Sequence, residues 1–98
     1  MVKAKRKGTR VEEKVIAMFE AIGGKCVRSA GSHGPFDVVA FVGPAVFLIQ
    51  VKANRKPGPE EIEAMRAWPS GPLTAKAYCV WKDYEKSPDF WWEGEWMK

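Results

Sequence analysis

Apolar residues recur at helical spacing near the start of the chain. The stripe comprises Val11, Val15, Met18, Phe19 and Ile22. It predicts an amphipathic helix that is capped by Thr9, with Glu12 three residues later as in a capping box, and that stops at the glycines of positions 23 and 24. The basic residues 1–8 before this helix are predicted to form a flexible arm.

Short apolar or β-branched runs follow and predict strands. They cover residues 25–28, 36–42, 45–53 and 75–82, with a weaker candidate at 90–96. Gly43 and Pro44 form a turn that joins the second and third runs as a hairpin, and Pro59 opens a second helix that reaches Trp68. The predicted order is helix, three strands, helix, two strands. Such an order indicates one mixed α/β domain over residues 9–98, in which helices cover a sheet.

Positive charge is unevenly distributed along the chain. The net charge is +4 and the sequence pI is about 9.2, which suggests an anionic partner such as nucleic acid, with simple solubility as the alternative. The basic residues gather in two clusters, Lys3, Lys5, Arg6, Lys7 and Arg10 at the start and Lys52, Arg55 and Lys56 in the middle. The first cluster is interpreted as a phosphate-binding arm, and a solvated tail is the competing interpretation.

Several classes of protein are disfavoured by the sequence. No apolar run reaches membrane-spanning length, and no signal-peptide core follows the basic start. Cys26 and Cys79 lack the spacing of a zinc site. We therefore expect a cytoplasmic protein without a membrane partner, associated with the nucleoid if its anionic partner is DNA.

Three polar residues in the predicted hairpin are the candidates for chemistry. Asp37 begins one strand, and Gln50 and Lys52 lie near the end of the next, so the three side chains are predicted to converge at one end of the sheet. Carboxylate and amide oxygens can hold magnesium, which phosphodiester hydrolysis uses to activate water. A neighbouring lysine can orient that water or neutralise charge in the transition state, and Glu12 can supply another carboxylate. The alternative is structural, a turn acid and a strand-end lysine that reaches into water.

These residues lie within three segments that resemble the archaeal-type Holliday junction resolvases of the PD-(D/E)XK nuclease superfamily. The similar segments are residues 6–13 (RKGTRVEE), 27–37 (VRSAGSHGPFD) and 48–52 (LIQVK). They occur in the family's order and at matching intervals between Arg6 and Lys56. The resemblance implies an α/β restriction-endonuclease-like core with a mixed central sheet flanked by helices. It also implies a homodimer that cuts four-way DNA junctions during recombination and repair.

The resemblance also implies roles for individual residues. Glu12, Asp37 and Gln50 fall on the metal-binding positions, for Mg²⁺ with Mn²⁺ as a substitute, and Lys52 falls on the catalytic lysine. Ser32 matches a loop serine near the scissile phosphate, so the catalytic set comprises Glu12, Ser32, Asp37 and Lys52. The expected DNA-binding residues are Lys5, Arg6, Lys7, Arg10, Arg28, Ser32, Arg55 and Lys56.

Gln50 departs from the family pattern, which usually has glutamate at this position. An amide oxygen can still bind magnesium but adds no negative charge. Two alternatives therefore stay open, another repair nuclease or nickase of this superfamily and an inactive module that binds branched DNA. The single histidine, His33, is interpreted as a bystander in its loop.

Two further features of the sequence carry structural expectations. The C-terminal tryptophans 91, 92 and 96 are expected in the core or a dimer contact rather than stacked on bases. The acidic face of the second helix, with Glu60, Glu61 and Glu63, is expected to point away from DNA because it would repel phosphates.

Overall fold

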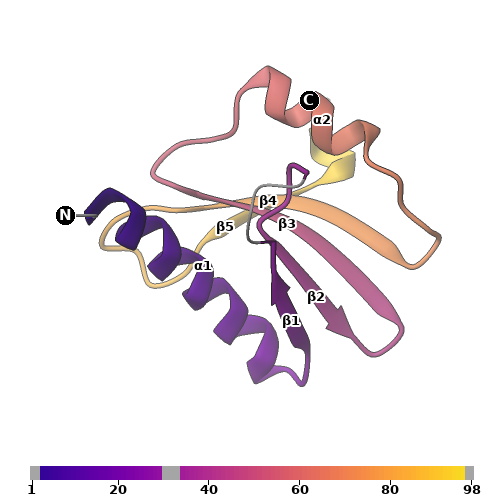
Figure 1. The fold of residues 1–98 in the computed structure, drawn as a ribbon, viewed down its shortest axis with the longest axis horizontal. Coiled ribbons are helices and arrows are strands. Elements are labelled where there is room, and N and C mark those ends of the chain that lie inside the picture. The colour runs from indigo at the N-terminus through magenta and orange to yellow at the C-terminus, as the bar shows by residue number, and fades with distance from the viewer. Residues whose placement is uncertain (1–2, 30–33, 97–98) are drawn as a thin grey trace.

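The computed structural model describes residues 3–29 and 34–96, with only the course of the backbone for residues 3–9. The elements in chain order are α1 (Lys3–Ala21), β1 (Lys25–Arg28), β2 (Val38–Val42), β3 (Ala45–Ala53), α2 (Pro59–Ala67), β4 (Thr74–Trp81), β5 (Asp89–Trp92) and the short 3-10 helix η1 (Glu93–Glu95) (Figure 1). The predicted order of helices and strands is confirmed.

The five strands form one mixed sheet in the order β1-β2-β3-β4-β5 (Figure 1). The predicted hairpin is confirmed, because β2 and β3 pair antiparallel around the turn at Gly43, where φ is +56°. Glycine adopts this left-handed conformation without the steric cost that a side chain brings. β3 and β4 pair parallel, whereas β1 and β5 pair antiparallel with their neighbours at the two edges.

The parallel pair needs a crossover, which α2 provides. A chain that leaves one strand and enters a parallel neighbour must return along the sheet, and a helix is the usual connection. The start of α2 therefore lies near the end of β3, where Lys52 is located. The crossover therefore decides which α2 side chains face the end of the hairpin that carries Asp37, Gln50 and Lys52.

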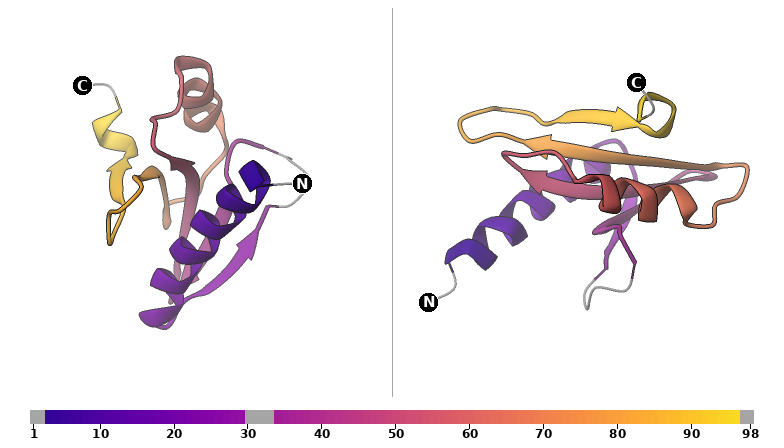
Figure 2. Two further views of the ribbon diagram at one scale, coloured as in Figure 1. Left: turned by 90° about the vertical axis from the view of Figure 1, so that its left-hand side faces the viewer. Right: turned by 90° about the horizontal axis from the view of Figure 1, so that it is seen from above.

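Two apolar clusters lie on opposite faces of the sheet, because side chains alternate along each strand. Ile49 and Cys79 belong to one cluster, and Leu48 and Tyr78 belong to the other. α1 covers the first face through Val11, Val15 and Phe19. α2 covers the second face chiefly through Met65, which is fully buried. The two helices consequently lie well apart in space (Figure 2).

The start of α1 differs from the prediction. The helix begins at Lys3, ahead of the expected cap at Thr9, so the basic residues from Lys3 to Lys7 belong to its first turns. Lysine, alanine and arginine are strong helix formers, and a single glycine at position 8 costs only about 1 kcal/mol relative to alanine. The capping signal at Thr9 is thereby overridden.

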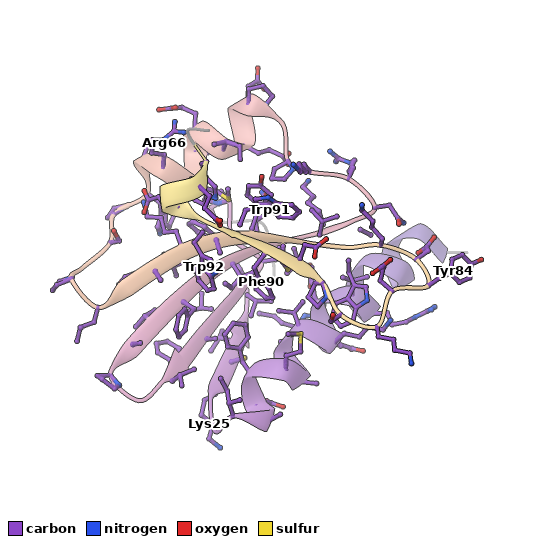
Figure 3. All side chains as sticks on the ribbon, turned by 180° about the vertical axis from the view of Figure 1, so that it is seen from behind. Lys25, Arg66, Tyr84, Phe90, Trp91 and Trp92 are labelled. Atoms are coloured by element: carbon purple, nitrogen blue, oxygen red, sulfur yellow. The ribbon has the colours of Figure 1, made fainter. Side chains whose placement is uncertain are left out.

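The C-terminal strand is also shorter than expected, since residues 93–95 turn into η1. Its aromatic side chains alternate across the sheet: Trp91 lies on one side of β5, with Phe90 and Trp92 on the other (Figure 3). Tyr78 stacks on Trp91 with ring centroids 5.2 Å apart and on Trp96 at 6.1 Å. Trp91 and Trp96 pack against the core as expected.

Candidate active site

Asp37 directly precedes β2 and lies beside the end of β3. Val38 is the last β2 residue paired with β3, opposite Ile49, and the Asp37 amide also donates to the Ile49 carbonyl, at 2.9 Å. Gln50 and Lys52 lie two residues apart on β3 and therefore share a face of the sheet, and both line one cleft with Asp37. Asp37, Gln50 and Lys52 therefore lie together at one end of the sheet.

These side chains line a cleft with a volume of about 670 Å³. Its polar lining consists of Glu12, Ser29, Asp37, Gln50, Lys52, Glu60 and Glu61, and its apolar lining includes Phe36 and Trp68. The cleft thus draws on α1, the β1–β2 connection, β3 and α2. All four segments supply charged groups to the cleft.

Asp37 is oriented by the backbone of the neighbouring strand. Its Oδ2 accepts a hydrogen bond from the Val51 amide at 2.8 Å. Burial raises the pKa of this carboxyl above its ordinary value, and the negative charge of Glu61 adds to the rise. The Val51 hydrogen bond and the Lys52 ammonium lower the pKa but do not cancel the effect of burial.

Gln50 is buried, with 6% of its surface exposed. Its Nε2 donates to the Pro35 carbonyl at 3.0 Å, which fixes the amide. Its Oε1 is buried and makes no hydrogen bond to any residue that the structure describes. A buried acceptor without a partner is costly in an apoprotein, and this oxygen is of the type that a magnesium ion binds.

Glu12 reaches the cleft from α1 and pairs there with Arg28 of β1. The Arg28 Nη2 to Glu12 Oε1 distance is 3.2 Å. Burial and the charge of Asp37 raise the pKa of Glu12, and the Arg28 guanidinium opposes this rise. Arg28 is thereby held at the edge of the cleft, with 42% of its side chain exposed.

Lys52 forms an ion pair with a residue that the sequence reasoning assigned elsewhere. Its Nζ lies 2.7 Å from Glu61 Oε2. The expectation that the acidic face of α2 points away from the site is therefore wrong for Glu60 and Glu61, which both line the cleft. Glu63 instead pairs with Arg66, at 2.6 Å, on the exposed side of the helix.

A signal for Glu61 was present in the order of the elements. A strand–helix–strand crossover returns the start of the helix to the end of the first strand. Lys52 is the last residue but one of β3, and Glu61 lies in the first turn of α2. Using this signal requires the parallel pairing of β3 with β4, which the sequence pattern alone does not provide.

The other expected DNA-binding residues are not part of the described cleft lining. Arg10, Arg55 and Lys56 are exposed, and Lys56 Nζ lies 4.7 Å from the centre of the Trp91 ring. Lys5, Arg6 and Lys7 lie on α1, where only their backbone is described. Ser32 and His33 lie outside the described residues.

Within residues 3–29 and 34–96, no three histidine, cysteine, aspartate or glutamate side chains form a group that could hold a metal ion. None of the described helices is long and apolar enough to cross a membrane.

The fold and cleft define the chain as an α/β protein with a restriction-endonuclease-like core, as predicted. The structure is similar to that of Hjc, a Holliday junction resolvase from Archaeoglobus fulgidus, with a TM-score of 0.74 and 23% identity over 90% of this chain and 74% of that chain. The chain belongs to the archaeal Holliday junction resolvase (Hjc) family, whose model matches residues 3–91. No curated protein sequence matches the chain. The resemblance inferred from the three sequence segments is thereby confirmed.

Proposed function

We propose that this chain is a magnesium-dependent endodeoxyribonuclease that resolves four-way DNA junctions by paired phosphodiester hydrolysis in the cytoplasm. Membership of the resolvase family supports the substrate class. The observation that carries the proposal is the shared cleft of Asp37, Gln50, Lys52 and Glu12. A metal-binding acid and amide beside an ammonium group are the parts that phosphodiester hydrolysis requires.

The residues present fit a bound magnesium ion. Asp37 and Gln50 would hold it, the first through its carboxylate and the second through its unpartnered Oε1. Glu12 would add a second carboxylate, shared with Arg28. When bound, Mg²⁺ or Mn²⁺ supplies charge stabilisation at the phosphate and an activated water. The raised pKa values of Asp37 and Glu12 are the expected cost of gathering carboxylates in a partly buried cleft before a cation neutralises them.

Lys52 would act on the scissile phosphate. An ammonium group has three donors, and one of them is directed at Glu61. The remaining two can contact phosphate oxygens and offset the charge that develops during hydrolysis. Arg28 at the cleft edge, with the exposed Arg10, Arg55 and Lys56, would contact flanking phosphates and set the position of the strand.

A homodimer would supply the second active site. Resolution of a junction requires a cut in each of two strands, and the described part of the chain has one cleft with this set of residues. A twofold-symmetric pair presents two identical sites to a substrate with matching symmetry.

The decisive experiment is incubation of a labelled four-way junction with magnesium, for the wild type and for Asp37→Asn. The wild type is expected to make paired, symmetric nicks, and Asp37→Asn is expected to bind the junction without cutting it. A flap and a plain duplex as competitors separate junction resolution from the activity of another repair nuclease. If the wild type binds the junction but never cuts it with magnesium or manganese, the protein is a binding module and the proposal is wrong.

A further inference from the structure

Glu61 makes two hydrogen bonds with separate oxygens. Its Oε1 accepts from the Gly58 amide at 2.8 Å, which caps the start of α2. Its Oε2 accepts from Lys52 Nζ at 2.7 Å. The carboxylate is therefore fixed to the helix by one oxygen and presents the other to Lys52.

The helix that carries Glu61 is held at its opposite end by a buried lysine. Lys76 of β4 is 3% exposed and donates to the carbonyls of Met65 at 2.9 Å, Arg66 at 3.0 Å and Trp68 at 2.6 Å. These carbonyls lie at the C-terminal end of α2, where the helix dipole favours a positive charge. Since Met65 is also fully buried, α2 has a defined position over the sheet, and so does Glu61.

We propose that Glu61 is a positioning residue that holds the Lys52 ammonium in the orientation needed for phosphate contact. The inference rests on the proposed nuclease function. It assigns to the acidic start of α2 a role inside the active site, although this charge opposes the approach of DNA. The favourable effect on Lys52 must therefore outweigh that repulsion.

The physical argument concerns the freedom of Lys52. A lysine side chain has four flexible carbons and loses about 2 kcal/mol of rotamer entropy when it is immobilised. The hydrogen bond to Glu61 immobilises the ammonium before substrate arrives, so this entropy is not lost again in the transition state. Only 16% of the Lys52 side chain is exposed, and partial removal from water strengthens the ion pair relative to one at the surface.

Glu61→Gln is a sharp test because it separates the two hydrogen bonds. Glutamine also serves at this position of a capping box, so the Gly58 amide keeps an acceptor. The amide nitrogen, a donor, would then face the Lys52 ammonium, and the positioning contact is lost. Glu63→Gln is the matched control, because it makes the same substitution on the same helix and breaks an ion pair with Arg66 outside the cleft.

Three readouts are combined, namely junction affinity without metal, the single-turnover cleavage rate with magnesium, and the side-chain NMR signal of the Lys52 ammonium. The NMR signal is assigned by its absence from Lys52→Met. We expect Glu61→Gln to lower the cleavage rate about 10- to 100-fold, to leave affinity equal or slightly higher, and to abolish the slowly exchanging Lys52 signal. Glu63→Gln is expected to match the wild type in all three.

A double variant completes the design. In the Lys52→Met background, Glu61→Gln should change the residual cleavage rate no further, because its effect acts through the lysine. An unchanged cleavage rate or a persistent Lys52 signal in Glu61→Gln overturns the inference while wild-type cutting still stands. Failure of the wild type to cut instead overturns the proposed function, and the NMR signal alone then decides whether Glu61 holds Lys52.

Discussion

At the scale of single residues, the Gln50 amide has a donor, Nε2, that forms a hydrogen bond and an acceptor, Oε1, that forms none with the described residues. The bond from Nε2 to the Pro35 carbonyl requires an amide, because a carboxylate oxygen in that place would meet the carbonyl oxygen. If Gln50 binds the proposed cation, the missing hydrogen bond at Oε1 is the cost of leaving that oxygen available to the cation in the metal-free state. Glutamine therefore suits the metal-free state of this cleft better than the glutamate usual in the family.

This trade-off leads to a prediction for Gln50→Glu. The added negative charge should lower the magnesium concentration for half-maximal cleavage by about tenfold, which corresponds to about 1.4 kcal/mol. The same change should lower the melting temperature of the metal-free protein, because the bond to Pro35 becomes a repulsion. Magnesium titrations of cleavage and thermal melts in chelator measure the two effects.

The substitution Gln50→Glu should therefore destabilise the metal-free protein but strengthen its stabilisation by magnesium. Magnesium should raise the melting temperature of Gln50→Glu more than that of the wild type, because a ligand that binds the folded state stabilises it. Complete loss of cleavage in Gln50→Glu would contradict this view and show that the amide has a role that a carboxylate cannot take.

At the scale of elements, α2 depends on two lysines of the sheet. Lys52 contacts its first turn through Glu61, and Lys76 binds the carbonyls at its end. Because α2 is short and contributes one fully buried side chain, Met65, these polar contacts carry much of its attachment. α2 thus connects the candidate site, through Lys52, with β4, through Lys76.

We therefore predict that Lys76→Met destabilises the protein markedly. Methionine approximates the shape of the stem, but it leaves the carbonyls of Met65, Arg66 and Trp68 without this donor and removes the 3.8 Å ion pair with Glu93. A buried group left unsatisfied costs about 1–3 kcal/mol. For a domain of this size the melting temperature should fall by about 4–8 °C per kcal/mol. Lys82→Met, at an exposed position just after β4, is the control and should melt within a degree or two of the wild type. Equal shifts in the two variants would refute the role of Lys76.

The elements also show which parts of the fold were predictable. The hairpin of β2 and β3 was predicted from two β-branched runs and the Gly43-Pro44 turn, and it brings Asp37 beside the end of β3, where Gln50 and Lys52 lie. The start of α1 was misplaced because the capping signal at Thr9 competes with strong helix formers before it. The start of a helix therefore depends on the balance between capping residues and helix propensity, and the capping signal alone does not fix it.

The candidate site was predictable only where it depends on one hairpin. Glu61 was assigned to the wrong face because its place follows from the parallel pairing of β3 with β4, a contact between segments far apart in sequence. The expectation that acidic side chains repel phosphates placed the start of α2 away from the site. The ion pair between Lys52 and Glu61 shows that an acidic side chain of this helix lies in the cleft instead. The role of Lys76 was likewise invisible, because its partners are backbone carbonyls of another element.

At the scale of the whole molecule, the proposed homodimer leads to a prediction about the products. Two sites in one symmetric dimer cut both strands within a single encounter, so a cruciform in a supercoiled plasmid should become linear without accumulating nicked circles. A dimer with one Asp37→Asn subunit has one working site and should release nicked circles instead. Subunit mixing before addition of magnesium, followed by gel analysis of the plasmid forms, measures this.

The proportion of subunits makes the experiment quantitative. With equal amounts of wild type and Asp37→Asn, random exchange gives about one half mixed dimers and one quarter wild-type dimers. Nicked circles should then increase at the expense of linear product, and wild type mixed with wild type is the control. Linear product that falls only in proportion to dilution, without nicked circles, would show that the subunits do not exchange, whereas nicked circles that already accumulate in the wild-type control would show that each cut comes from an independent chain. Sedimentation of labelled subunits distinguishes these, because only the first retains a particle of about twice the chain mass of 11.0 kDa.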